Sequence, residues 1–148
     1  MTRFLLVVVF ILSLYAIVSS AKAETSIQFG GISHHFISDD TTNNFHRAVI
    51  ISHEDYLAGY LRNSYDQDSF VVAYNIYKET KKNYSTDVYL GAVRGYDKCY
   101  GAFEEGENKN KVTACPLLVI NVTINTDTVV KPVLSLWGDA LVLTGKID

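Results

Sequence analysis

Short apolar runs alternate with polar, turn-forming clusters along this chain from about residue 27 to its end. Side chains of a strand point to opposite faces in turn, and the runs are rich in aromatic and β-branched residues, so the pattern favours strands. No segment shows the spacing of an amphipathic helix. We predict eight strands: Ile27–Phe36, Phe45–His53, Tyr56–Asn63, Ser69–Tyr77, Asp87–Gly95, Val112–Asn125, Thr128–Leu136 and Ala140–Ile147.

The connections between the predicted strands are mostly short and polar, as in Asn125-Thr-Asp127 and Trp137-Gly-Asp139. Short links join neighbouring antiparallel strands, whereas a parallel crossover needs about a dozen residues or more. The sequence therefore predicts an all-β fold, an eight-stranded antiparallel up-and-down barrel, whose closure removes exposed sheet edges. A β-sandwich is the alternative, although its Greek-key crossings usually need a longer connection.

Charged side chains are absent from long stretches of the predicted strands, including Tyr56–Leu61 and Val112–Ile124. Uncharged strands with one apolar face and tyrosine-rich ends are typical of outer-membrane barrels. Small soluble barrels that bind a hydrophobic ligand share much of this pattern. The chain ends on Asp148 rather than on the aromatic residue that commonly finishes bacterial outer-membrane strands, which favours the soluble alternative. Both interpretations stay open.

The first 23 residues match a secretory signal peptide, and residues 24–148 then form a single domain. Arg3 supplies the positive charge, Phe4–Val18 is apolar apart from one serine, and Ala21-Lys-Ala23 matches a cleavage site. The apolar run is shorter than the roughly 20 residues that span a bilayer, so a membrane anchor is the weaker alternative. Removal of Arg3 and Lys22 lowers the formal charge from −3 to −5, which argues against a nucleic-acid partner.

Export places the two cysteines, Cys99 and Cys115, in a compartment where they can be oxidised. With only two present, the pairing is forced if they pair, and the bridge would close a charged loop and contribute about 3 kcal/mol. Free buried thiols or a metal site are the alternatives. Two cysteines without a nearby histidine pair make zinc improbable, and we expect neither a metal nor a cofactor.

Four histidines lie in the first third of the mature chain: His34, His35, His46 and His53. Strand alternation puts His34 and His35 on opposite faces, with Ser33 on the same face as His35, so only one of the pair can face a given site. Gly30 and Gly31 just before them allow a bend in the strand. The simpler interpretation is an exposed histidine beside a hydrogen-bonded rim histidine.

A second candidate segment, Arg62-Asn-Ser-Tyr-Asp66, ends the third predicted strand. In a meander the first and third strands point the same way, so His34 or His35 and the pair Asn63 and Ser64 lie on one rim. A serine beside a histidine has the arrangement of a nucleophile and its base. The same segment also has the composition of an ordinary β-turn.

Three motifs together resemble the lipid A palmitoyltransferase family and its shorter relatives, some of them encoded by phages. They are Ser33-His-His-Phe36, Asn63-Ser-Tyr65, and Cys115-Pro-Leu-Leu-Val119 at the start of a later strand. Members of that family are eight-stranded outer-membrane barrels that move an acyl chain from a phospholipid to lipopolysaccharide. The Pro-Leu-rich strand start marks the family's lateral opening.

The resemblance places the family's active histidine on His34, with His35 as the alternative register, and its serine on Ser64. The aspartate of the family's pattern is replaced by Asn63, which can orient a neighbour but cannot take a proton. The family's amphipathic N-terminal helix and long first external loop are also missing.

Two functions follow as expectations. The first is a monomeric envelope acyltransferase whose partners are phospholipid and lipopolysaccharide, with His34 as general base, Ser64 assisting or attacking and Asn63 orienting. The second is a non-enzymatic exported barrel, in the outer membrane or the soluble periplasm, that binds a hydrophobic ligand or modifies the cell surface. The first ranks slightly higher because two rim motifs coincide with the family's pattern.

Overall fold

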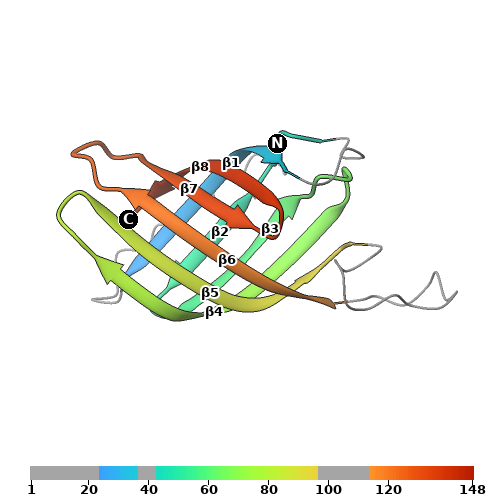
Figure 1. Ribbon diagram of the computed structural model, residues 1–148, viewed down its shortest axis with the longest axis horizontal. Coiled ribbons are helices and arrows are strands. Elements are labelled where there is room, and N and C mark those ends of the chain that lie inside the picture. Colours follow the sequence, from blue (N-terminus) through green and yellow to red (C-terminus); the bar gives the residue numbers. More distant parts are fainter. Residues whose placement is uncertain (1–23, 37–42, 97–113) are drawn as a thin grey trace, which may run out of the picture.

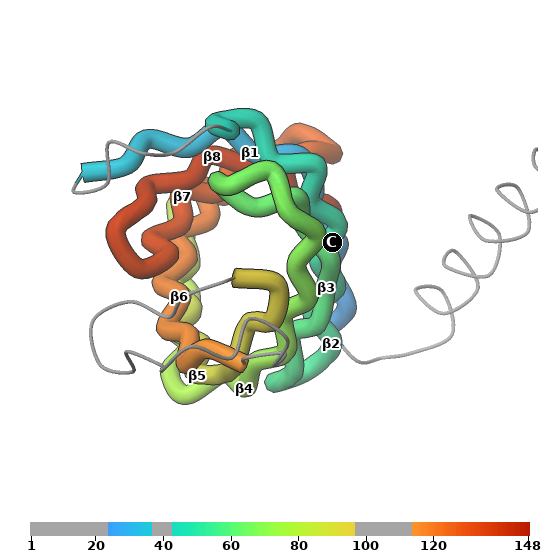
Figure 2. Tube along the Cα trace, turned by 90° about the vertical axis from the view of Figure 1, so that its right-hand side faces the viewer, coloured from blue at the N-terminus to red at the C-terminus, as the bar shows by residue number. Residues whose placement is uncertain are grey.

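The structure is a computed structural model and describes residues 24–36, 43–96 and 114–148. These residues form a closed antiparallel barrel in which each strand pairs with its sequence neighbours and β1 pairs with β8 (Figure 1). Seen from one end, the strands make a complete ring (Figure 2). The predicted eight-stranded up-and-down barrel is confirmed. The strands are β1 (Thr25–His35), β2 (Val49–His53), β3 (Tyr56–Arg62), β4 (Asp68–Thr80), β5 (Tyr84–Arg94), β6 (Ala114–Ile124), β7 (Lys131–Trp137) and β8 (Ala140–Ile147).

Two strands begin later than the sequence predicts. Strand β2 starts at Val49 rather than Phe45. The segment before it meets β1 at the Gly30–Gly31 bulge, through the isolated bridge between Ile32 and Phe45 and three backbone hydrogen bonds, and not through a continuous ladder. Strand β7 starts at Lys131 rather than Thr128, because the residues before it form bends. The predicted signal peptide, residues 1–23, lies outside the described residues.

A bulge at Gly30 and Gly31 changes which side chains of β1 face the interior. These glycines have φ of 70° and 153°, values that a residue with a side chain rarely adopts, and the pairing with β8 shifts register there. Before the bulge, Gln28 is buried inside the barrel; after it, Ser33 takes the buried position. The residues that follow therefore present the opposite face from the one an unbroken strand would give.

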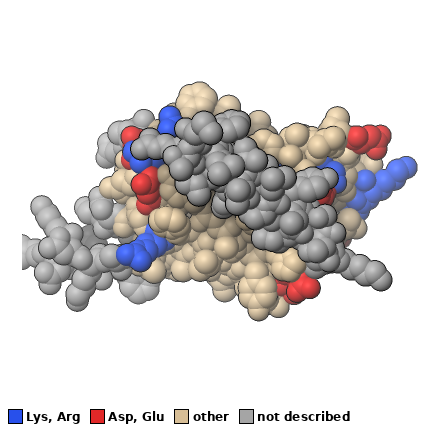
Figure 3. Space-filling view, turned by 180° about the vertical axis from the view of Figure 1, so that it is seen from behind, with Lys and Arg blue, Asp and Glu red and all other residues tan. Residues whose placement is uncertain are grey.

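The barrel is apolar outside and partly polar inside. The outer belt, as we call the large apolar side chains exposed on the outside of the strands, surrounds the described wall. It comprises Phe29, Ile32, Val49, Phe70, Val72, Tyr74, Ile76, Leu90, Leu118, Ile124, Leu134, Leu136, Leu143 and Ile147. In Figure 3 the charged side chains gather towards the two ends of the visible face, and the described surface between them carries few.

Polar contacts fill the interior near one end of the barrel. Gln28 Nε2 donates to Thr144 Oγ1 at 2.6 Å and to Ser135 Oγ at 3.3 Å, and Asn75 Nδ2 donates to buried Asp87 at 3.2 Å. These pairs satisfy polar groups that would otherwise be costly to bury. Towards the other end, apolar side chains are buried beside a second polar group. The apolar ones include Leu61, Val93, Leu117 and Val142, and the polar ones include Ser33, His46, Asn63, Ser64 and Ser69.

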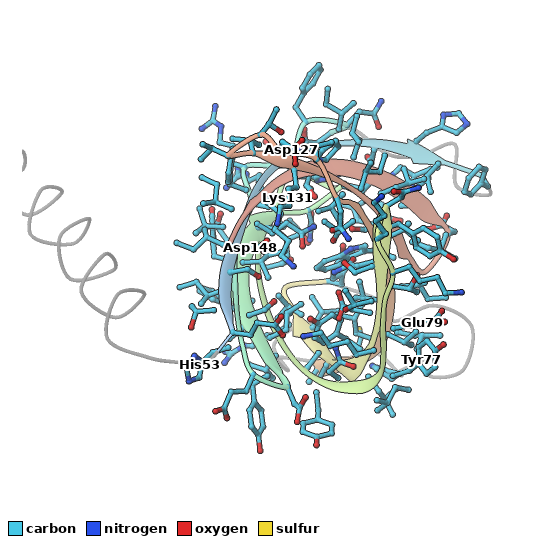
Figure 4. All side chains as sticks on the ribbon, turned by 90° about the vertical axis from the view of Figure 1, so that its left-hand side faces the viewer. His53, Tyr77, Glu79, Asp127, Lys131 and Asp148 are labelled. Carbon is cyan, nitrogen blue, oxygen red and sulfur yellow. The ribbon has the colours of Figure 1, made fainter. Side chains whose placement is uncertain are left out.

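The two ends of the barrel differ in their connections. The turn rim carries the connections 54–55, 81–83 and 125–130. The loop rim carries the two longest connections, 36–48 and 95–113, together with the short turns 63–67 and 138–139. Figure 4 looks onto the turn rim, where Lys131 and Asp148 lie towards each other and form an ion pair. Within the described ranges, no helix is long and apolar enough to cross a membrane.

Candidate functional site

Three side chains from separate parts of the chain meet at the loop rim. His35 ends β1, Ser64 lies in the turn after β3, and Asp139 lies in the tight turn between β7 and β8. Ser64 Oγ is 2.8 Å from His35 Nε2, and Asp139 Oδ1 is 3.6 Å from His35 Nδ1. The side chains of His35 and Asp139 are only 8% and 10% exposed, so their interaction is weakly screened by water.

The closure of the barrel explains why His35 and Asp139 are neighbours. His35 pairs with Ala140 at the start of β8, and Phe36 N donates to the Asp139 carbonyl at 3.1 Å. The β7–β8 turn has only Gly138 and Asp139 between its strands, and Gly138 has a φ of 57°, which suits glycine. The turn therefore holds Asp139 beside the end of β1.

The structure separates the two adjacent histidines. His34 is exposed outside the barrel and packs edge-on against Phe36, with ring centroids 5.5 Å apart. His35, the alternative register in the sequence analysis, is the histidine that contacts Ser64. The bulge at Gly30 and Gly31 causes this, because it places Ser33 and His35 on the interior face.

Asn63 builds the turn that presents Ser64. It is fully buried, and its Oδ1 accepts hydrogen bonds from Tyr65 N at 2.9 Å and Gln67 N at 3.0 Å. Its Nδ2 donates to Ser69 Oγ at 3.0 Å and to the carbonyl of Gly95 at 2.9 Å. Both ends of the amide are therefore used by the turn and by strand ends, and Asn63 acts on Ser64 through the backbone.

The hydrogen bonds imply a definite arrangement of protons. If the Ser64 hydroxyl donates to His35 Nε2, the neutral ring carries its proton on Nδ1, which lies on the Asp139 side. A hydroxyl, a neutral imidazole that accepts its proton and a carboxylate behind the other ring nitrogen make up a nucleophilic triad. The 3.6 Å separation between His35 and Asp139 exceeds a hydrogen bond, as is common before substrate binds.

An apolar cavity of about 330 Å³ adjoins these three side chains. Its volume falls in the range of about 300–1,000 Å³ that is usual for ligand sites. His35, Ser64 and Asp139 contribute to its wall, and most of the rest is hydrophobic. The other lining residues include Leu61, Tyr65, Val93, Tyr96, Cys115, Pro116, Leu117, Leu136, Trp137, Ala140 and Val142.

The cavity also reaches side chains of the outer belt. Strand β6 pairs with β7 only from Val119 onwards, so its first residues are paired with β5 alone. Pro116 lies in this part and has no N–H to offer a further strand. Outward-facing Leu118 and Leu136 line the cavity together with interior residues, so the barrel wall is interrupted between the ends of β6 and β7.

The other candidates of the sequence analysis lie elsewhere or stay untested. His53 is exposed at the turn rim, with Nδ1 2.8 Å from Thr25 Oγ1 (Figure 4). Cys115 is buried on the inner face of β6, but Cys99 lies outside the described residues, so the bridge between them stays a prediction. In the described part of the chain, no three His, Cys, Asp or Glu side chains cluster as metal ligands.

Asp139 is the site residue that the sequence analysis missed. The family's pattern directed attention to the position before the serine, where this chain has Asn63. The predicted closure of the barrel could have identified Asp139, because closure puts the end of the first strand, with its histidines, beside the start of the eighth strand. The Trp137-Gly-Asp139 turn was recognised, but its aspartate was not paired with the histidine.

Comparison of the chain with protein-family models, with curated proteins and with solved structures gave no match, so the functional assignment rests on the geometry of this site.

Proposed function

We propose that this protein is an envelope acyltransferase that takes an acyl chain from a phospholipid, with Ser64 as nucleophile, His35 as general base and Asp139 as the carboxylate that orients His35. The observation that carries the proposal is the 2.8 Å contact between Ser64 Oγ and His35 Nε2 at the wall of an apolar cavity. Asp139 lies 3.6 Å from the other nitrogen of the same imidazole, where its carboxylate would favour the tautomer that accepts a proton from serine.

The chemistry balances without a cofactor. Ser64 Oγ attacks the carbonyl carbon of the phospholipid ester while its proton passes to His35 Nε2. The ester carbon–oxygen bond then breaks, and the departing lysophospholipid hydroxyl takes that proton. A hydroxyl of lipid A or of a similar acceptor next attacks the acyl-serine, gives its proton to His35, and leaves as the new ester while Ser64 recovers a proton. Water in the same role would release a fatty acid.

The surroundings of the site favour a lipid substrate. The cavity is mainly hydrophobic, and the interruption between β6 and β7 connects it with the outer belt, where a barrel in a membrane would meet acyl chains. An apolar outside, a partly polar inside and short turns at one end with longer connections at the other are typical of outer-membrane barrels. In such barrels the longer connections are extracellular, so the site would face the outer leaflet.

A direct test uses the purified mature protein with a phospholipid and lipid A in mixed detergent micelles. Lysophospholipid and acylated lipid A are measured by mass spectrometry. We expect Ser64→Ala and His35→Ala to lower the rate by about 10²-fold or more, since both remove a reacting group. Asp139→Asn should lower it by at least about tenfold, because the imidazole loses its orienting charge.

His34→Ala is the matched control, because it removes an adjacent imidazole that faces outwards. This variant should keep the wild-type rate. Equal rates in His34→Ala and His35→Ala, or lysophospholipid production that survives Ser64→Ala, would contradict the assignment. A folded wild-type barrel that binds the phospholipid without ever releasing a lyso product would favour the non-enzymatic alternative.

A further inference from the structure

A second serine–histidine pair lies directly behind the first. His46 Nδ1 is 2.7 Å from the carbonyl oxygen of Arg62, and a carbonyl can only accept, so Nδ1 carries the proton. In the neutral ring, Nε2 is then an acceptor, and it lies 2.7 Å from Ser33 Oγ. Both side chains are buried, at 7% exposure each. The Ser33 hydroxyl proton is therefore directed at His46, and its oxygen lone pairs are left for another partner.

That other partner is His35. Ser33 Oγ lies 3.4 Å from His35 Nε2, the same nitrogen that receives the 2.8 Å contact from Ser64. Two hydroxyls thus converge on one ring nitrogen from different elements. A neutral Nε2 has a single lone pair, and the closer Ser64 takes it. Ser33 becomes the useful neighbour only after His35 has been protonated.

During the acylation step, His35 becomes protonated and needs a new hydrogen-bond acceptor. Once the Ser64 proton has moved to His35, Nε2–H requires an acceptor until the leaving hydroxyl takes the proton. During that time Ser64 Oγ is bonded to the substrate carbon and accepts hydrogen bonds poorly. A hydroxyl whose own proton is held elsewhere is a suitable replacement, and a hydrogen bond from a charged donor is stronger than one between neutral groups. Ser33 meets both conditions because His46 holds its proton.

We propose that Ser33, oriented by His46, is a positioning residue that accepts the hydrogen bond of protonated His35 in each tetrahedral intermediate, after the attacking hydroxyl has given up its proton and before the leaving group takes it. This inference rests on the proposed function. It assigns a role to Ser33 and His46, the buried pair that the triad does not use. Within each half-reaction, it gives the proton on His35 a hydrogen-bond acceptor until the leaving group takes that proton.

The charged surroundings of His46 are consistent with this role. Burial lowers the pKa of His46, the nearby His35 lowers it further, and the hydrogen bond to the Arg62 carbonyl opposes these effects. His46 also borders a cleft of about 620 Å³, separate from the apolar cavity. The other ionisable groups around His46 are Asp139 beyond His35 and the four that line this cleft, namely Arg47, Tyr60, Arg62 and Asp66. A neutral His46 keeps the Ser33 proton. A protonated His46 would donate to Ser33 and turn that hydroxyl towards His35, where it competes with Ser64.

The experiment measures how fast an alkyl fluorophosphonate labels the folded barrel in detergent micelles, with mass spectrometry to identify the labelled serine. In this reaction the Ser64 oxygen–phosphorus bond forms, fluoride leaves, and the serine proton stays on His35. We expect Ser33→Ala to slow labelling of Ser64 about 10- to 100-fold, since a hydrogen bond to a charged group is lost. Ser26→Ala, a buried serine on the same strand, is the control and should react at the wild-type rate.

The pH profile separates positioning from a merely structural role. A protonated His46 no longer accepts from Ser33, so labelling of the wild type should slow further, by up to the factor seen in Ser33→Ala, as the pH falls through the lowered pKa of His46. In His46→Gln, whose amide oxygen can still accept from Ser33 but cannot be protonated, this further slowing should be absent. A wild-type rate in Ser33→Ala, or the same pH profile in His46→Gln and wild type, would overturn the inference while leaving the triad intact. Labelling of Ser33 instead of Ser64, or no labelling at all, would overturn the triad as well.

Discussion

At the scale of single residues, the site is assembled from three positions that are far apart in the sequence. His35 and Ser64 are joined by one hydrogen bond of 2.8 Å, and Asp139 approaches from the turn between the last two strands. Asn63 is next to Ser64 in sequence, yet its amide makes two hydrogen bonds to the backbone of the turn and two to the ends of other strands, at Ser69 and Gly95. The sequence neighbour of Ser64 therefore takes no direct part in the proposed chemistry, whereas the distant His35 and Asp139 do.

The buried histidine behind the triad predicts how stability depends on pH. Because the pKa of His46 is lowered below its ordinary value of 6.5, the unfolded chain takes up a proton at a higher pH than the folded barrel does. The free energy of unfolding should therefore fall as the pH drops below about 6.5 and level off below the folded-state pKa. Urea unfolding in micelles at pH 7.5 and at lower values measures this change.

The variant His46→Gln should show a smaller loss of stability over the same pH interval, because the buried ionisable group is gone. His34→Gln, which removes an exposed imidazole, is the control and should behave as the wild type does. An identical loss in His46→Gln and wild type would assign the pH dependence to other groups.

Much of this site follows from sequence reasoning, but its final geometry does not. The rim shared by the histidines and Ser64 follows from a meander, in which the first and third strands run in the same direction. The choice between His34 and His35 depends on the bulge, and the presence of two glycines indicates a bend without fixing where the register shifts. Asp139 could be recognised as a site residue only from the pairing of β1 with β8. The local pattern of apolar and polar residues does not contain that long-range contact.

At the scale of elements, close approach between strands explains two glycines in the wall. A Cβ atom on Gly91 would lie 2.1 Å from the Val72 carbonyl oxygen and 2.5 Å from the Cα of Ala73, its partner on β4. Gly59 on β3 faces similar contacts with β2, where Ile50 Cα would be 2.7 Å away. The pattern of apolar residues located these strands, but it cannot report how closely two backbones approach.

Gly91→Ala should therefore lower the free energy of unfolding by about 1–3 kcal/mol, since backbone atoms of β4 must move to admit a methyl group. Heat-dependent mobility in gels and urea titration both measure the change. Ala92→Val, at the next position on the same strand, points to the other face and should change the value by no more than about 0.5 kcal/mol. Equal effects of the two substitutions would show that β4 and β5 tolerate a wider separation.

At the scale of the whole molecule, large apolar side chains are exposed outside the barrel, and the interior holds polar as well as apolar side chains. Large hydrophobic residues are exposed around the wall, while Asp87, Asn121 and Ser135 are buried within it. The sequence showed that each strand has two unlike faces, and the closed barrel shows which of them is turned outwards. This arrangement is the observation that supports the proposed insertion into a membrane.

A charge in the outer belt tests that placement. Leu134→Arg should destabilise the barrel in phospholipid vesicles by about 2–4 kcal/mol, the cost of an arginine on the lipid face near the middle of a bilayer. Urea titration of the vesicle-inserted barrel gives the value. Thr126→Arg, in the turn before β7, adds the same charge at the turn rim and should be nearly neutral. A mature protein that stays monodisperse in buffer without detergent, with or without Leu134→Arg, would contradict membrane insertion.

The consecutive histidines at the end of β1 give the site an unusual tolerance to change. Every second residue of a strand faces the barrel interior. Because His34 and His35 are adjacent, one of the two imidazoles faces the interior whichever set of alternate residues is turned inwards. The bulge at Gly30 and Gly31 selects His35. An insertion or deletion of one residue upstream would exchange the two histidines rather than abolish the base, and descendants of this sequence could drift in strand length while keeping an imidazole beside Ser64.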